Sequence, residues 1–232
     1  MKVCDSALVI MAKAPRPGVV KTRLSACLPP ASILGLYRCL LEDTLALAQS
    51  LDGVEAAIMC PTADVDELSR IAGPRVRVVA QTSDGLGAAL TAVFAYFAAG
   101  GRRVVAFNSD SPHLPPAVLR MAFAALLSCD LVAGPTHDGG YYLVGASASH
   151  PGLFAGNSMG TASALDSLLA RARSLALSVT LTDPFYDIDV PEDLSRLAEE
   201  LRLAPKRAPR TASWLAAWSS AAADIQAGGA GT

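Results

Sequence analysis

Short apolar runs alternate with longer amphipathic stretches along almost the whole chain. Runs such as Ala7–Met11 and Val104–Phe107 are continuous and brief, as is typical of strands buried on both faces of a sheet. Stretches such as Ala31–Ser50 repeat apolar residues every three or four positions, which predicts helices with one buried face. The alternation predicts an α/β fold with three layers, α/β/α, around a mostly parallel sheet. We expect strands at 7–11, 54–60, 76–81, 104–107, 131–134, 141–145 and 178–181, and helices at 31–50, 64–72, 87–99, 115–128, 161–172 and 191–203.

The end of the chain departs from this alternation. Residues 1–203 form one expected domain, and the Pro-rich basic stretch 204–210 resembles a linker. Thr211 is placed to cap a last helix, in which Trp214 and Trp218 share a face. This helix can dock on the domain, join two subunits in an oligomer or touch a membrane surface, and docking is the simplest of these. The glycine-rich end, 228–232, is expected to be disordered.

Composition removes several classes of protein from consideration. Of the 232 residues 52% are hydrophobic and 17% charged, which excludes a disordered chain. The net charge of −2 gives no reason to expect a nucleic acid partner. Five cysteines without a C-x-x-C pair disfavour a disulfide framework and a cysteine zinc site. We expect no membrane span, no signal peptide and a cytoplasmic location.

A basic loop follows the first predicted strand. It covers Ala12–Leu24 and carries four cations, Lys13, Arg16, Lys21 and Arg23, among prolines and a glycine that restrict its shape. Ligands of α/β sheets bind at the carboxyl ends of strands, and cations there favour a phosphate. The alternative is a solvated surface loop whose charges serve solubility.

Two acidic segments offer ligands for a metal. Asp110 follows a buried strand and precedes a proline, where a carboxylate can hold a divalent cation against a substrate phosphate, although Ser-Asp-Ser-Pro is also ordinary turn chemistry. Asp187 and Asp189 alternate around Ile188, so both can face one side of an extended segment. Because Glu192 and Asp193 suit the start of the next helix, Asp189 is the better candidate for the metal.

A third candidate segment is the turn at Asp138–Tyr142. Its two glycines allow a ligand to approach the backbone, and Asp138 can orient an acceptor or act as a base. A plain hairpin turn explains the same residues and predicts that the strand at 141–145 runs antiparallel. The sequence lacks both the G-x-G-x-x-G and the G-x-x-x-x-G-K-[ST] motif, which counts against a dehydrogenase and a P-loop kinase.

Taken in order, these segments resemble a known family. Met11–Pro15 with Pro17–Leu24, Ser109–Pro112, Asp138–Leu143, and Tyr186–Asp189 with Pro191–Leu194 are similar to bacterial GT-A-like glycosyltransferases associated with radical-SAM and selenium-domain proteins. That family is related to 2-phospho-L-lactate guanylyltransferase and the molybdenum cofactor nucleotidyltransferases. The resemblance implies the nucleotide-diphospho-sugar transferase (GT-A, Rossmann-like) fold over residues 7–197.

The resemblance also implies roles for individual residues. Asp110 and Asp189 would hold Mg²⁺ or Mn²⁺, and Asp138 and Lys21 would be catalytic. Gly139, Gly140 and Tyr142 would meet the second substrate. Nucleotide and phosphate contacts would come from Ala12, Lys13, Lys21, Arg23, Gln81, Gly85, Gly87 and Asn108.

The expected activity is metal-dependent transfer from an activated nucleotide, either a nucleotide sugar or a nucleoside triphosphate, to a small-molecule acceptor. Glycosyl transfer is the first hypothesis, and nucleotidyl transfer to a phosphorylated acceptor is the alternative. The rival of another class is a non-catalytic nucleotide-binding or scaffold protein. Asp84–Ala89 favours that rival, because it lacks a charged pair that the family commonly carries there.

Overall fold

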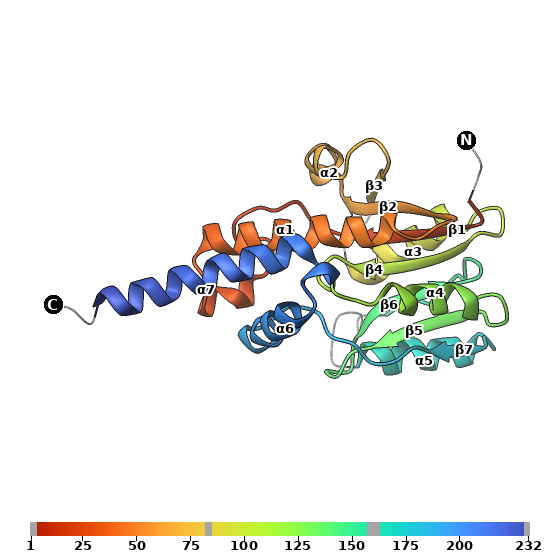
Figure 1. Cartoon of the computed structure of the whole chain (residues 1–232). Coiled ribbons are helices and arrows are strands. Elements are labelled where there is room, and N and C mark those ends of the chain that lie inside the picture. The colour runs from red at the N-terminus through yellow and green to blue at the C-terminus, as the bar shows by residue number, and fades with distance from the viewer. Residues whose placement is uncertain (1–3, 82–84, 157–162, 230–232) are drawn as a thin grey trace.

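The computed structural model describes residues 4–81, 85–156 and 163–229, and it has the three-layer architecture expected from the sequence (Figure 1). The strands of this part are β1 (Ser6–Met11), β2 (Val54–Pro61), β3 (Arg77–Gln81), β4 (Arg103–Asn108), β5 (Leu131–Pro135), β6 (Tyr141–Ala146) and β7 (Val179–Leu181). They form one sheet in the order β3-β2-β1-β4-β6-β5-β7. The strand β6 runs antiparallel to β4 and β5, as the turn before it predicts, and the other neighbouring pairs are parallel.

Helices cover both faces of the sheet. On one face lie α1 (Pro30–Gln49), α2 (Val65–Ala72) and α4 (Pro116–Ala125), and on the other lie α3 (Leu86–Phe97) and α5 (Ala164–Ser174). The strand β1 shows why its sequence is apolar without alternation: Leu8 and Ile10 belong to the first core cluster, Ala7 and Val9 to the second. Among the described residues, no helix combines the length and apolar character needed to cross a bilayer.

A third core cluster lies outside the sheet layers. It joins the outer face of α1 to α6 (Pro191–Leu203) and α7 (Pro209–Gly229), and Figure 1 shows α7 running alongside α1. The two helices approach closely at Gly35, where a Cβ atom would lie 2.9 Å from the Trp214 indole nitrogen. The rings of Trp214 and Trp218 stack at 5.8 Å. Both rings pack against this cluster, as docking predicts, and a subunit contact through α7 stays a prediction.

The attachment of α7 differs from the sequence-based expectation. The expected linker contains a 3-10 helix, η3 (Pro205–Arg207), and α7 begins before Thr211. Thr211 is held by Asp43 of α1, whose carboxylate accepts hydrogen bonds from the Thr211 amide at 2.8 Å and hydroxyl at 2.9 Å. The helix extends to Gly229, residues 230–232 lie outside the described residues, and disorder of the glycine-rich end stays a prediction.

The parallel strands at the centre of the sheet end together on one side. The strands β1 and β4 are parallel neighbours at the centre, and β1 pairs with β2 on its other side. In such sheets ligands bind beyond the carboxyl ends of strands, where the connections diverge. The basic loop leaves β1, and Asp110 leaves β4, at this same end.

Asp43 tests how much the docking of α7 contributes to stability. Its side chain is fully buried, so Asp43→Ala removes the acceptor of Thr211 and leaves buried donors without a partner. We expect the free energy of unfolding, measured by urea denaturation, to fall by about 2 kcal/mol. The control is the adjacent Glu42→Ala, which removes surface ion pairs to Arg38 and Arg210 and should cost less than about 0.5 kcal/mol. Equal losses in the two variants would contradict this role of Asp43.

Candidate functional site

The basic loop is anchored at two points before it reaches its charged end. The Ala14 amide donates to the buried Asp64 carboxylate at 2.9 Å, and Arg16 forms an ion pair with the other oxygen of Asp64 at 2.8 Å. Arg16 also contacts Glu67 at 3.2 Å. Arg16 thus fastens the loop to α2 and the turn before it, and it is not among the residues lining the cavity described below.

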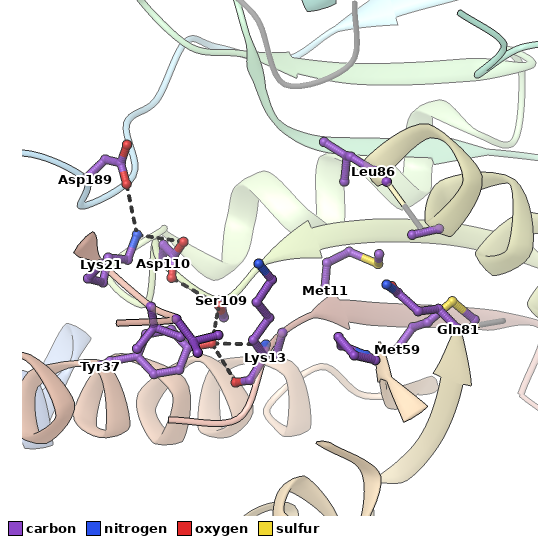
Figure 2. A pocket seen from close by; sticks show the side chains of 16 residues that line it. Met11, Lys13, Lys21, Tyr37, Met59, Gln81, Leu86, Ser109, Asp110 and Asp189 are labelled. Atoms are coloured by element: carbon purple, nitrogen blue, oxygen red, sulfur yellow. Dashed lines mark hydrogen bonds and ion pairs between the residues drawn. The ribbon is translucent and has the colours of Figure 1, made fainter. Parts of the chain in front are cut away.

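Tyr37 of α1 anchors the loop on its other side. Its hydroxyl donates to the Lys13 carbonyl at 2.9 Å, accepts from the Lys13 amide at 3.2 Å and lies 3.3 Å from the Ser109 hydroxyl (Figure 2). Ser109 in turn donates to Asp110 at 3.0 Å. Burial raises the pKa of the Tyr37 phenol well above its ordinary value, so the phenol stays protonated. One hydroxyl therefore sets the positions of both the basic loop and the acidic turn.

Lys21 lies between two carboxylates. Its ammonium nitrogen is 2.7 Å from Asp110 and 3.6 Å from Asp189, and its side chain is only 4% exposed. Burial opposes the charged form, but the attraction and hydrogen bond of Asp110 outweigh it and raise the pKa of Lys21. Arg23 is much more exposed and contacts the other oxygen of Asp189 at 2.7 Å.

Asp189 is brought to Asp110 by backbone pairing between two distant segments. The Ile188 amide donates to the Asp110 carbonyl at 3.2 Å, and the Ser111 hydroxyl donates to the Tyr186 carbonyl at 2.9 Å. Asp193 supports the same segment, because its carboxylate accepts from the amides of residues 189 and 190 at the start of α6. The helix-capping role expected for Asp193 is thus confirmed.

Asp187, two residues before Asp189, is affected by the charges of this cluster. Burial raises its pKa above the ordinary range; the charges of Asp110 and Asp189 add to the rise, and Lys21 opposes it. The alternation around Ile188 gave this residue the same face as Asp189, but the sequence offered no reason to prefer it. The charge of Asp187 acts on Lys21 and helps to raise its pKa, but among these two residues only Asp189 contacts the ammonium and lines the cavity described below.

These groups form one end of a cavity of about 620 Å³ at the carboxyl end of β1 (Figure 2). Lys13, Lys21, Asp110 and Asp189 lie at the charged end, and the Lys13 side chain extends into the open space. The other end is mostly apolar, with the Gln81 amide as its polar side chain. Figure 2 shows Met11, Met59, Gln81 and Leu86 there; Pro61 of β2 and, from the start of α3, Gly85 and Ala89 line the same cavity.

The structure brings together about half of the residues predicted from the sequence. Gly85 has a positive φ of 89° directly before α3, a conformation that favours glycine. Residues 82–84, which precede it, lie outside the described residues. The predicted residues that line the cavity are Ala12, Lys13, Lys21, Gln81, Gly85, Asp110 and Asp189.

Other predicted residues have structural tasks away from this lining. The side-chain oxygen of Asn108 accepts from the Asp110 amide at 3.1 Å, which fixes the acidic turn. Gly87 lies within α3. Tyr142 is 2% exposed and donates to the Asp183 carbonyl at 3.1 Å, so its ring belongs to the core rather than to this cavity. Arg23 contributes charge through Asp189 without lining the cavity.

The Asp138 turn has the geometry of the plain hairpin. Its carboxylate accepts from the Thr136 hydroxyl and from the Gly140 amide, and Gly139 has a positive φ of 87°. The Thr136 hydrogen bond is the main cause that lowers the pKa of Asp138, and Arg23 contributes to the same shift. A lowered pKa makes this carboxylate a weak base, and the turn does not line the cavity. Roles for Asp138, Gly139 and Gly140 toward a second substrate stay predictions.

The donor set at the charged end fits a divalent cation held together with a phosphate. Among residues 4–81, 85–156 and 163–229, no group of three or more His, Cys, Asp or Glu side chains forms a closed metal site. Asp110 and Asp189 nevertheless converge on one point, the ammonium of Lys21. Mg²⁺ commonly binds one or two carboxylates and completes its coordination with substrate phosphates and water. Mg²⁺ or Mn²⁺ at this pair stays a prediction.

The segment that carries Asp187 and Asp189 rests on an aromatic cluster. His113 is fully buried and packs against the rings of Phe185 and Tyr186 at 4.8 Å and 4.7 Å. Neither of its ring nitrogens has a hydrogen-bond partner among the described residues. Burial, helped by the charges of Arg207 and Arg196, lowers the pKa of His113 to about 3. A neutral imidazole is therefore part of the support of the acidic segment.

The Tyr37→Phe variant tests the shared anchor. It keeps the ring but removes the hydroxyl that joins Lys13 to Ser109, so we expect unfolding free energy to fall by about 1 to 2 kcal/mol in urea denaturation. Tyr96→Phe is the matched control, because Tyr96 is 52% exposed on α3 and should change stability by less than about 0.5 kcal/mol. If Tyr37→Phe and Tyr96→Phe had the same free energy of unfolding, the Tyr37 hydroxyl would not be an anchor of the loop.

His113 makes stability depend on pH. The unfolded chain binds a proton near pH 6.5 and the folded chain only near pH 3, so stability falls as pH drops between these values. The slope from this group is at most about 1.4 kcal/mol per pH unit. In His113→Leu we expect a shallower loss of stability than in the wild type, measured by denaturation from pH 7 to pH 4. His137→Leu, at an exposed loop position, should keep the wild-type slope.

Comparison with known proteins confirms the fold. A proposed nucleotide-diphospho-sugar transferase from Desulfovibrio desulfuricans G20 superposes with a TM-score of 0.86 at 28% identity, covering 94% of this chain and 96% of that one. The 4-diphosphocytidyl-2C-methyl-D-erythritol synthase from Anaerococcus prevotii DSM 20548 gives 0.58 at 13% identity, over 85% and 96% of the two chains. A nucleotidyl transferase from Methanothermobacter thermautotroptrophicus gives 0.57 at 16% identity, over 86% and 98%.

These neighbours share the nucleotide-diphospho-sugar transferase fold that the sequence resemblance implies. No curated protein matches the sequence. A model of the family described as "Uncharacterized protein conserved in bacteria (DUF2064)" matches residues 44–161, just over half of the chain. The match takes in β2 to β6 with the acidic turn at Asp110. The protein therefore belongs to the DUF2064 family.

Proposed function

We propose that this protein is a transferase that binds an activated nucleotide in the cavity beyond β1 and passes part of it to a small-molecule acceptor. The observation that carries the proposal is the division of the cavity into a charged end and an apolar end. A nucleotide has the same division, because its phosphates are anionic and its base has apolar faces. The phosphates would lie against Lys13 and Lys21, and the base between the methionines and Leu86.

This proposal assigns a role to several charged and polar residues at the cavity. The ammonium of Lys13 extends into the cavity and neutralises phosphate charge, with Arg23 adding positive potential from its place beside Asp189. Gln81 offers both a donor and an acceptor to a base edge, and the positive φ of Gly85 opens the backbone next to it. Asp110 and Asp189 would hold Mg²⁺ or Mn²⁺, which supplies positive charge for the phosphates when bound.

Glycosyl transfer is the first candidate chemistry. An acceptor oxygen forms a bond to the anomeric carbon, the bond from that carbon to the terminal phosphate oxygen breaks, and the nucleoside diphosphate leaves while the acceptor proton passes to a base. The similarity to the proposed nucleotide-diphospho-sugar transferase, over nearly the whole chain, favours this reaction. Cations around the leaving diphosphate stabilise the charge that develops on it.

Nucleotidyl transfer is the second candidate. Here an acceptor phosphate oxygen forms a bond to the α-phosphorus of a nucleoside triphosphate, and pyrophosphate leaves. Two of the structural neighbours, a nucleotidyl transferase and a diphosphocytidyl-methylerythritol synthase, are named for reactions of this class. The cations Lys13, Lys21 and Arg23 also suit the high negative charge of a triphosphate.

Binding of a nucleotide panel tests the proposal. We expect one member of a set of UDP, GDP, CDP, their sugars and the triphosphates to bind in calorimetry only with Mg²⁺ or Mn²⁺ present. Preference for a nucleotide sugar, with release of a nucleoside diphosphate on addition of acceptors, supports glycosyl transfer. Preference for a triphosphate, with release of pyrophosphate, supports nucleotidyl transfer. No binding under any condition would favour the non-catalytic scaffold instead.

Asp110→Asn and Lys13→Met test separately the metal role proposed for Asp110 and the phosphate role proposed for Lys13. We expect Asp110→Asn to remove the metal-dependent part of nucleotide affinity, and Lys13→Met to weaken nucleotide binding by about tenfold or more, the loss of one charge-assisted contact. The control Asp52→Asn alters an exposed carboxylate just before β2, at the end of this strand away from the cavity. This variant should bind nucleotide like the wild type. Unchanged affinity in Asp110→Asn would refute the metal assignment.

A further inference from the structure

The Lys21 ammonium occupies the place where the predicted metal ion would bind. It lies 2.7 Å from Asp110 and 3.6 Å from Asp189, so it occupies the point on which these carboxylates converge (Figure 2). The Lys21 side chain is 4% exposed, and bulk water screens its contact with Asp110 less than it screens a surface pair. The two carboxylates predicted to hold a divalent cation are thus already paired with one cation of the chain, which occupies the space between them.

The backbone commits Lys21 to this position. Its φ of 50° and ψ of 40° are in the left-handed region, which a residue with a Cβ rarely adopts. Its carbonyl accepts the Leu24 amide at 3.0 Å, and Leu24 is buried in the third core cluster. The ammonium itself is carried on four flexible methylene groups, so it can move several ångströms while the backbone stays in place.

A divalent cation and the ammonium cannot both use the same carboxylate oxygens. At separations of a few ångströms their mutual repulsion, in a partly dehydrated site, is comparable to the attraction that each gains from one carboxylate. Nucleotide phosphates offer the ammonium another anionic partner next to Lys13. Moving the ammonium to a phosphate frees Asp110 and Asp189 at the same moment as that phosphate supplies further metal ligands.

We propose that Lys21 is a built-in counter-ion that closes the Asp110–Asp189 site to divalent cations in the free protein, so that metal and nucleotide enter together. The inference rests on the proposed function, because it needs both the metal and the phosphates. It goes beyond the proposed function by predicting that the two ligands bind cooperatively: metal alone binds weakly, and each ligand strengthens the binding of the other. By linkage, the factor by which nucleotide tightens metal binding equals the factor by which metal tightens nucleotide binding.

The direct test is Mn²⁺ binding without any nucleotide. The free Mn²⁺ signal in electron paramagnetic resonance reports binding to the full chain and needs no catalytic activity. Lys21→Met keeps most of the side-chain length and removes the charge, so we expect it to bind Mn²⁺ about tenfold or more tightly than the wild type. Adding Asp110→Asn to Lys21→Met should abolish this gain.

Arg23→Met is the matched control. It also removes one positive charge from Asp189, but Arg23 is exposed and does not contact Asp110. We expect a much smaller gain in Mn²⁺ affinity from this variant, because the point between the two carboxylates stays occupied. An equal gain in both variants would reduce the effect to net charge and overturn the proposal.

Further outcomes separate this inference from the proposed function. If the wild type binds a nucleotide with metal, but Lys21→Met binds Mn²⁺ no more tightly, the counter-ion role fails and the proposed function stands. If no nucleotide of the panel binds with or without metal, both fail.

Lys21→Gln serves as a second uncharged variant, and thermal unfolding checks that each variant is folded. If the wild type binds Mn²⁺ with a micromolar or lower Kd in the absence of nucleotide, the proposal is overturned without any variant.

Discussion

The structure depends on one short region of pairing between the turn after β4 and the segment before α6. Two hydrogen bonds, from the Ile188 amide to the Asp110 carbonyl and from the Ser111 hydroxyl to the Tyr186 carbonyl, join segments about 75 residues apart in the chain. Because of this pairing Asp189 reaches the end of the sheet where Asp110 lies, and Lys21 can contact both. Without it the chain would have a basic loop and a single acidic turn, but no convergent site.

Much of the architecture could be predicted because it depends on local pattern. Continuous apolar runs identify strands buried on both faces, and periodic apolar positions identify the covering helices, so the layer order follows from the sequence. The same reasoning places the basic loop and Asp110 at one end of the sheet, since parallel strands expose their carboxyl ends together. Even the antiparallel course of β6 is predictable, because two glycines after Asp138 require a tight turn.

The parts of the site that the sequence did not indicate depend on contacts between distant residues. Tyr37 fits the apolar face of α1 by its spacing, but a buried phenol needs a hydrogen-bond partner and here has Lys13 and Ser109. Arg16 belongs to the basic loop by sequence, yet it pairs with Asp64 and Glu67 and leaves the loop with fewer cations for a ligand. The side-chain oxygen of Asn108 and the hydroxyl of Tyr142 have partners within the protein, which the sequence did not indicate, and their predicted ligand contacts stay predictions.

The C-terminal helix is linked to the site through α1. Its attachment at Asp43 and its close contact at Gly35 hold the outer face of α1, while Tyr37, two residues after Gly35, directs its hydroxyl toward the site from the same helix. A helix fixed on both sides cannot shift without breaking a buried hydrogen-bond network on one of them. The orientation of Lys13 and Asp110 therefore depends on packing far from any ligand. Residues after 203 therefore contribute to the rigidity with which Lys13 and Asp110 are held.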